Sequence, residues 1–266
     1  MFMAKNPADV FREPLTRPRR RALSELLAAC SAAYHDTSAI PLQDRWTAES
    51  TFFAELNDHG VVFQGEGWIV VAVAGTDNAA DWRGNLDYAP APLGPYESRV
   101  AGGFGDAFRA MWGGLDDLLR ALWPAFGTRQ EGLQNNPPLV TFTGHSRGGA
   151  LAQLLALEFW ASRSTHCQCV TFGSPRVFSG GQYLPADWQQ TLWRVEHSND
   201  IVPHTPPCWR FRHRGTRVFL DEDGTLLENP SWLQLVRRKL RGYCFDTVRD
   251  HLLGNYRLSL EQRDDD

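Results

Sequence analysis

The chain has no long hydrophobic run and no excess of positive charge. No stretch of about 18 consecutive apolar residues occurs, so the sequence predicts no membrane-spanning helix. The formal net charge is -4 and the isoelectric point is about 6.1, which argues against nucleic acid as the main partner. Lysine is nearly absent while arginine is abundant, which we attribute to coding bias rather than to function.

Cysteine is scarce, and its spacing does not form a disulfide framework. The five cysteines are an odd number, which favours a reducing compartment, and they form no metal-binding pattern. The segment Arg17–Cys30 begins with basic residues and ends like a lipoprotein cleavage site, but its apolar run, Ala22–Leu27, is too short and too polar for a signal peptide. We therefore expect an amphipathic surface helix over Arg21–Tyr34 and a cytoplasmic protein, with export by a signal-less route left open.

Strands and helices are expected to alternate along the chain. Apolar runs predict strands at Val61–Gln64, Trp68–Ala74, Leu139–Thr143, Cys167–Phe172, Thr191–Glu196, Arg210–Leu220 and Thr225–Leu227, the last two flanking an Asp223-Gly224 hairpin turn. Helices are expected at 21–34, 104–122, 149–162, 231–240 and 252–260, with a short helical turn at 52–56. This order predicts an α/β fold with a mostly parallel central sheet covered by helices on both faces. We expect one such domain over residues 21–262, after a flexible arm at 1–20 and before a frayed tail at 263–266.

The most informative motif is Gly144-His145-Ser146-Arg147-Gly148. It lies between a predicted buried strand and a predicted helix, which is the setting of a nucleophile elbow. In such an elbow the serine stands on a sharp turn, so that its hydroxyl is exposed above the sheet. Glycines are required on both sides because a Cβ there would clash with the neighbouring strand and helix. The motif therefore makes Ser146 the candidate nucleophile.

A serine hydroxyl needs a base, and the base needs a group that orients it. In this fold class the acid follows the serine in the chain and the histidine follows the acid. Asp200 comes directly after the predicted strand Thr191–Glu196, on the same rim as the elbow, and His251 lies in a late junction between loop and helix. Read alone, Asp200 is also an ordinary turn residue and His251 a surface histidine; His197 and His204 compete as bases but are too close in sequence to Asp200. The order and loop placement together favour Asp200 and His251.

An ester hydrolase also needs donors for the oxyanion of its tetrahedral intermediate. One is expected from the backbone N–H of the residue after the nucleophile, Arg147, and the other from the loop after an earlier strand. Gly75 and Thr76 end the predicted strand Trp68–Ala74 and suit that place, although a plain strand-end turn would have the same sequence.

At this point the chain resembles the class 3 (fungal-type) triacylglycerol lipases, from about Leu26 to Tyr256. Six segments carry the resemblance in the right order: Val73–Thr76, Asp81–Leu86, Gly144–Ala152, Val170–Val177, Asn199–His204, and Asp250-His251 followed by Tyr256. The resemblance implies an α/β-hydrolase fold that acts on carboxylic esters of lipids without a cofactor or metal. It implies the nucleophile at Ser146, the acid at Asp200, the base at His251, and oxyanion donors at Thr76 and Arg147.

The resemblance also implies a lid that controls substrate access, formed by Asp77, Asn78, Asp81, Trp82 and Asn85. One departure is Arg147, where the family usually has leucine; because only its backbone N–H is needed, we expect catalysis to survive. The expected partner is a lipid or small ester substrate, with peripheral contact to a lipid surface and no nucleic acid; the oligomeric state is open.

Two other functions stay open from the sequence. One is a phospholipase that attacks membranes, because Ser231–Gly242 interleaves apolar and basic residues as an interfacial helix does, although a surface helix with a solvated basic face has the same pattern. The other is a non-catalytic member that binds lipid or a protein partner, against which the complete set of Ser146, Asp200 and His251 argues.

Overall fold

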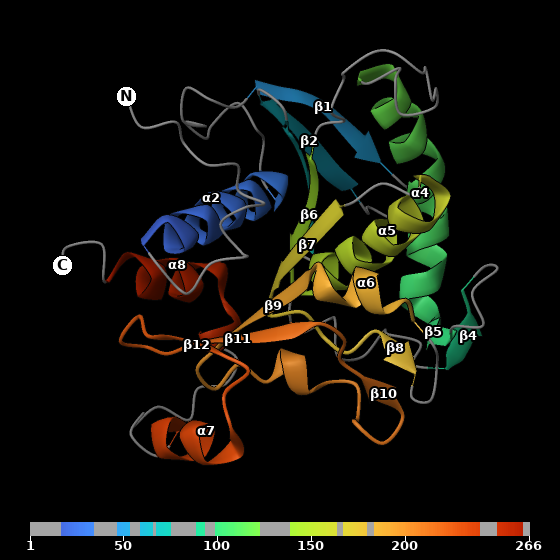
Figure 1. Cartoon of the computed structure of the whole chain (residues 1–266). Coiled ribbons are helices and arrows are strands. Elements are labelled where there is room, and N and C mark those ends of the chain that lie inside the picture. Colours follow the sequence, from blue (N-terminus) through green and yellow to red (C-terminus); the bar gives the residue numbers. More distant parts are fainter. Residues whose placement is uncertain are drawn as a thin grey trace.

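The computed structural model is built on a central sheet of eight strands in the order β1-β2-β3-β6-β7-β9-β11-β12 (Figure 1). The structure describes residues 17–34, 47–53, 59–65, 68–75, 89–93, 99–122, 139–163, 167–179, 184–239 and 249–262. The strands are β1 (Thr47–Phe53), β2 (His59–Gly65), β3 (Trp68–Val73), β6 (Leu139–His145), β7 (Cys167–Phe172), β9 (Leu192–His197), β11 (Thr216–Leu220) and β12 (Leu226–Glu228). The middle strands, from β3 to β11, run parallel, whereas β1, β2 and β12 pair antiparallel at the two edges.

Helices cover both faces of this sheet, as the sequence predicts. The helices α4 (Gly102–Leu122), α5 (Arg147–Arg163) and α6 (Ala186–Gln190) bury one core layer with the strands, and α2 (Arg17–Tyr34) and α8 (Leu253–Glu261) bury the other. Figure 1 shows the two groups on opposite sides of the sheet. Side chains alternate along each strand, so that Val70 and Ala72 pack toward α2 while Val71 and Val73 pack toward α4 and α5. The predicted α/β class is confirmed.

A second, smaller sheet lies beside α4 and was not expected from the sequence. Its order is β10-β8-β5-β4, formed by β4 (Pro90–Pro92), β5 (Arg99–Ala101), β8 (Phe178–Ser179) and β10 (Phe211–Arg212). Strands of two or three residues are too short to show an alternating pattern, which is why no sequence signal marks them. The remaining short elements are η3 (Val202–His204), η4 (Arg249–His251) and α7 (Trp232–Lys239).

Two predicted elements are wrong. The segment Phe52–Leu56 was expected to form a helical turn, but its described part ends β1, which pairs with β2. Arg210–Leu220 was expected to be one strand, but it divides into β10 and β11, which belong to different sheets. Gly215 stands between them with a φ of 72°, a conformation that ends an extended strand and that glycine adopts without strain. The hairpin after it is confirmed, since β11 and β12 pair across Gly224, whose φ is 75°.

The first helix begins earlier than predicted. It starts at Arg17, so residues 17–20, which the sequence assigned to the arm, are helical, and Pro18 lies in the first turn, where its missing N–H costs nothing. Arg20 donates to the carbonyl oxygens of Gly224 and Leu260, 2.6 and 3.3 Å away. Residues 1–16 and 263–266 lie outside the described residues. Among the described residues, none of the helices has the length and apolar content to cross a membrane, and no cluster of side chains suits a metal ion.

Candidate active site

Ser146 is the turn between β6 and α5, and its backbone has a φ of 58°. This left-handed conformation is unfavourable for a residue with a Cβ and is held here by the structure on both sides. A Cβ on Gly144 would lie 2.3 Å from the carbonyl oxygen of Gly148, and a Cβ on Gly148 would lie 2.2 Å from the carbonyl oxygen of Val73. The predicted reason for both glycines, clashes with the helix and the neighbouring strand, is therefore confirmed.

The structure brings Ser146, His251 and Asp200 together. Nε2 of His251 lies 2.8 Å from Oγ of Ser146, and its Nδ1 lies 2.9 and 3.0 Å from the two carboxylate oxygens of Asp200. All three residues are buried. A carboxylate only accepts hydrogen bonds, so the proton of the neutral imidazole is on Nδ1, and Nε2 is left to accept the serine proton. Three residues from separate loops at one edge of the sheet thus form one hydrogen-bonded series.

Asp200 is held by two further donors. The N–H of Val202 donates to its Oδ1 at 2.8 Å, and the hydroxyl of Tyr256 donates to its Oδ2 at 2.7 Å. Burial, followed by the charge of Asp200, raises the pKa of Tyr256 well above its usual value, so this hydroxyl keeps its proton and stays a donor. The N–H of His197 in turn donates to the Tyr256 oxygen at 3.1 Å. The sequence marked Tyr256 as part of a family segment but did not predict this role.

His145 and Tyr34 hold the loop that carries the His251 imidazole, and the sequence did not predict either of them as a site residue. Nε2 of His145 donates to the backbone oxygen of His251 at 2.7 Å, and the Tyr34 hydroxyl lies 3.0 Å from Nδ1 of His145. The rings of His145 and His251 are stacked with centroids 4.6 Å apart. Burial, together with the charge of His251, lowers the pKa of His145 well below its usual value, so His145 is neutral. Tyr34 is the last residue of α2 and lies 111 positions before His145, and no local pattern predicts a contact of that range.

The expected oxyanion donors are only partly described. Arg147 is the first residue of α5, so its N–H lies at the positive end of that helix dipole. Burial lowers the pKa of its guanidinium. Glycine is required at 75 because a side chain would clash there, not because the backbone adopts a conformation that only glycine tolerates. A Cβ at this position would lie 2.0 Å from the Tyr34 hydroxyl oxygen. Thr76 and the predicted lid residues Asp77, Asn78, Asp81, Trp82 and Asn85 lie outside the described residues.

The competing histidines lie away from the serine. His197 is buried, with Nδ1 3.2 Å from the Asp250 carbonyl oxygen and Nε2 2.9 Å from the Ser259 hydroxyl. His204 ends η3 and is exposed. Neither ring is joined to Ser146, which leaves His251 as the histidine that the structure brings to the hydroxyl.

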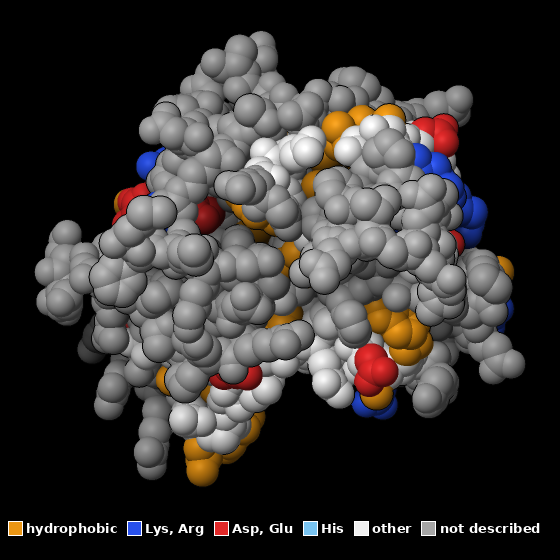
Figure 2. Space-filling model, turned by 45° about the horizontal axis from the view of Figure 1, so that its top comes forward, with side chains coloured by type: hydrophobic (Ala, Val, Ile, Leu, Met, Phe, Trp, Pro, Cys, Tyr) orange, Lys and Arg blue, Asp and Glu red, His pale blue; other side chains and the backbone are white. Residues whose placement is uncertain are grey.

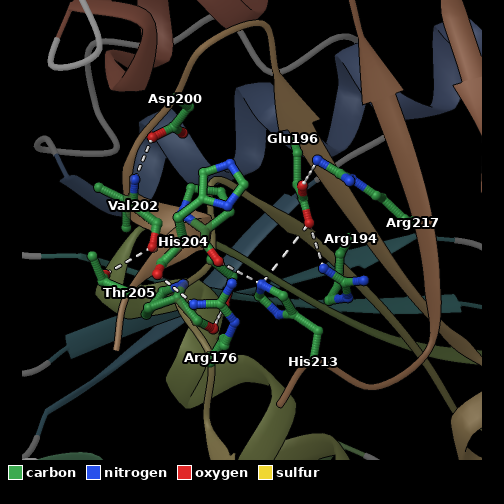
Figure 3. Close-up of polar contacts among 12 residues, drawn as sticks. Arg176, Arg194, Glu196, Asp200, Val202, His204, Thr205, His213 and Arg217 are labelled. Carbon is green, nitrogen blue, oxygen red and sulfur yellow. Dashed lines mark hydrogen bonds and ion pairs between the residues drawn. The ribbon is translucent and has the colours of Figure 1, made fainter. Parts of the chain in front are cut away.

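A buried ion cluster stands behind the loop that carries Asp200 (Figure 3). Glu196 is 6% exposed and pairs with Arg194 at 2.5 Å and Arg217 at 2.6 Å. His213 donates to the Pro203 oxygen at 2.7 Å, and Arg176 donates to the carbonyl oxygens of His204 and Pro206. Three carbonyl oxygens of the loop after β9 are therefore bound by Arg176, which follows β7, and by His213, which lies between β10 and β11. These contacts fix the backbone from which Asp200 projects.

The ionisation of this cluster depends on burial and neighbouring charge. Burial would raise the pKa of the Glu196 carboxyl, but Arg194, His213 and Arg217 outweigh it and lower the pKa to about 2. Burial, followed by the charge of Arg194, lowers the pKa of His213 to about 3. In the unfolded chain these groups titrate near 4.5 and 6.5. Protons thus bind the unfolded chain more readily than the folded one at both positions.

We expect the free energy of unfolding to fall as the pH falls below neutrality. The contribution of His213 is complete above about pH 6.5 and is lost progressively toward pH 3, while that of Glu196 is complete above about pH 4.5 and is lost toward pH 2. Between pH 7 and pH 5, His213 alone accounts for about 2 kcal/mol. Urea unfolding across this range measures it. His213→Gln is expected to reduce the slope of the profile without removing it, because the lowered pKa values of His145 and His197 still contribute, and the exposed His204→Gln is expected to leave the slope unchanged. A stability that is constant or higher at pH 5 would contradict this account.

The order of strands, the helices on both faces and the serine elbow between β6 and α5 together define an α/β-hydrolase fold. A search of family models gives the same result at the level of sequence, since the model of the lipase (class 3) family matches residues 70–209. The chain belongs to this family.

Individual members of this family and related proteins are similar to the chain over part of their length. The lipase of Rhizomucor miehei is 25% identical over 201 residues, which is 69% of this chain and 51% of that protein. The chloroplastic phospholipase A1 PLIP1 of Arabidopsis thaliana is 27% identical over 143 residues, which is 51% of this chain and 21% of that protein. The solved triacylglyceride lipase of Rhizomucor miehei superposes with a TM-score of 0.72 at 22% identity, covering 93% of this chain and 99% of that one. The chain spans between 19% and 55% of the length of such curated relatives.

Proposed function

We propose that the protein is a serine carboxylic-ester hydrolase that cleaves acyl esters of lipids through an acyl-enzyme. The observation that carries the proposal is the hydrogen-bonded series from Ser146 through His251 to Asp200, with the serine on a strained turn at the start of a helix. Membership of the lipase (class 3) family and the names of its relatives support lipid esters as the substrates.

In the proposed mechanism, neutral His251 takes the Ser146 proton on Nε2 as the oxygen attacks the ester carbonyl. Asp200 holds the imidazole in the required tautomer and stabilises its charged form. The N–H of Arg147 and that of Thr76 bind the oxyanion, each contributing about 3 kcal/mol to lowering the barrier. The alcohol then leaves with the proton from His251. Water attacks the acyl-enzyme and gives a proton to His251, which passes it to the Ser146 oxygen as the acid is released.

A phospholipase is the second candidate, favoured by the phospholipase A1 relatives from Arabidopsis and rice. A non-catalytic role, in which the protein only binds lipid or a protein partner, is the third candidate. The complete series of Ser146, His251 and Asp200 in this chain argues against that role, because a protein that only binds lipid has no need to hold an imidazole against a strained serine.

The proposal is tested by a fluorophosphonate probe and a substrate panel. We expect the probe to label one site, mapped to Ser146 by peptide mass, and the labelled protein to lose activity on p-nitrophenyl esters in the same proportion. Triglycerides and diacyl phospholipids, compared at equal bulk concentration, then separate the lipase from the phospholipase. Absence of labelling together with absence of hydrolysis on every ester would leave the binding role as the better account.

A further inference from the structure

A second functional surface follows directly after the loop that carries Asp200. Residues 201–220 contain four arginines and no aspartate or glutamate. Trp209 is 82% exposed, the highest exposure of the large hydrophobic side chains that the structure describes, and Arg210 and Arg212 beside it are exposed as well. We call Trp209, Arg210 and Arg212 the basic tip.

The basic tip is rigidly attached to the fold. Phe211, between the two arginines, is fully buried in the main core, so the alternation of the strand turns Arg210 and Arg212 outward. β10 pairs with β8, and the N–H groups of Arg210 and Phe211 both donate to the Pro207 oxygen, at 3.1 and 3.0 Å. An exposed tryptophan held on such a frame is presented to a partner without the cost of ordering a loop.

The positive charge of the basic tip is not compensated within the described structure. Neither Arg210 nor Arg212 forms an ion pair with any described residue, and Glu196 is paired with Arg194 and Arg217 instead. Burial and the charge of Arg212 lower the pKa of Arg214, which indicates that these cations repel one another.

The helix α4 is the opposite case. At the edge of the molecule where α4 lies, basic and acidic side chains occur together on the surface (Figure 2). On α4 itself, Arg109 pairs with Asp106 at 2.5 Å and Arg120 pairs with Asp116 at 2.9 Å. The arginines of α4 are matched by acidic residues, whereas those of the basic tip are not. This difference indicates an anionic partner for the basic tip.

We propose that the basic tip docks the protein on an anionic lipid surface and so delivers acyl esters to the neighbouring site. Tryptophan prefers the boundary between headgroups and acyl chains, and arginines beside it bind the lipid phosphates. The net charge of -4 does not prevent this contact, because charges more than about 8 Å apart are screened at physiological ionic strength and the attraction is local. The purpose of the docking rests on the proposed function, but lipid binding is measured without turnover.

The position of the basic tip suits this role. The chain passes from Asp200 through η3 to Trp209 within nine residues, and Arg176 and His213 fix the backbone between them. This loop leaves the sheet at the carboxyl end of β9, the same edge at which Ser146 stands at the end of β6. A surface bound at the basic tip therefore lies at the edge of the sheet where an ester must enter.

Flotation with vesicles tests the proposal. Ser146→Ala protein, which leaves the lipid intact, is mixed with phosphatidylcholine vesicles or with phosphatidylcholine vesicles that contain phosphatidylglycerol. We expect binding to the anionic vesicles only, weakened by salt. Arg210→Gln with Arg212→Gln is expected to lower the partition coefficient about 25-fold, since each arginine near such a surface contributes about fivefold. Trp209→Ala is expected to lower it about tenfold.

Trp232→Ala is the matched control, because Trp232 is also an exposed tryptophan, 73% exposed, but belongs to α7. It is expected to bind as the parent does. Loss of binding in Trp232→Ala with retention in Trp209→Ala would move the docking surface to α7 and overturn the proposal. Absent or equal binding to both vesicle types, preferential binding of single-stranded RNA, or a dimer broken by Trp209→Ala in light scattering would overturn it as well. When Ser146 is left unchanged, the variants of the basic tip should hydrolyse p-nitrophenyl butyrate at the parent rate. Failed docking and failed catalysis are therefore distinguishable.

Discussion

Ser146→Ala is expected to lower kcat for p-nitrophenyl butyrate by about 10⁶-fold while the melting temperature stays within a few degrees of the parent value. The loss is large because the oxygen of Ser146 is the group 2.8 Å from Nε2 of His251, and no other described hydroxyl is hydrogen-bonded to that nitrogen. The fold survives because alanine has the same Cβ and leaves the turn, with its φ of 58°, as it is.

Ser162→Ala is the matched control. Ser162 lies near the other end of the same helix, α5, and its hydroxyl donates only to the Phe159 oxygen at 3.4 Å. Its activity should equal that of the parent, measured by initial rates alongside fluorophosphonate labelling. Hydrolysis by Ser146→Ala within tenfold of the parent, with the fold intact, would remove Ser146 from the mechanism.

The elbow and the central strands could be predicted because their sequences are constrained locally. β3 was predicted at Trp68–Ala74 and observed at Trp68–Val73, because a strand covered on both faces is apolar throughout. The motif itself requires glycine at 144, since a Cβ there would clash with Gly148, and the neighbouring strand of the sheet requires glycine at 148. The order of serine, acid and histidine then reduced the remaining choice to a few loop residues.

The rest could not be predicted because its causes are distant in the sequence. β1, Thr47–Phe53, has a polar and irregular sequence and is made a strand by pairing with β2 at the edge of the sheet. The division of Arg210–Leu220 depends on where β8 and β9 lie, since each half pairs with a different one of them. In both cases tertiary contacts override the local pattern.

The supporting residues of the site show the same limit. His145 is inside the elbow motif and was available to sequence reasoning, but its role depends on the carbonyl of His251, 106 positions away. No sequence signal marks Tyr34. Its hydroxyl nevertheless lies 3.0 Å from Nδ1 of His145 and occupies the space that a Cβ on Gly75 would need. The sequence predicts only that α2 covers the sheet. Through Tyr34, this helix also positions His145, which binds the loop that carries His251, and it packs against the strand end before Thr76.

Asp200→Asn is expected to lower kcat by about 10⁴-fold with little change in KM. The asparagine can keep its carbonyl oxygen on the N–H of Val202, and its amide then replaces Oδ2 and faces the Tyr256 oxygen and Nδ1 of His251. Because an amide NH₂ only donates, this contact favours the tautomer in which Nδ1 accepts, and the imidazole proton then moves to Nε2. There it points at Ser146, and the ring can no longer take the serine proton.

Asp250→Asn is the matched control, since Asp250 is next to His251 in the chain and also buried, and its Oδ2 accepts from the N–H of Asn199 at 3.1 Å. An asparagine oxygen can accept the same bond, so this variant should keep its kcat within a few-fold of the parent. Steady-state rates on p-nitrophenyl butyrate, with urea unfolding to check the fold, measure both variants. A large loss in Asp250→Asn beside near-normal activity in Asp200→Asn would assign the orienting carboxylate to residue 250, and the tautomer argument built on the two contacts of Asp200 with the imidazole would fail.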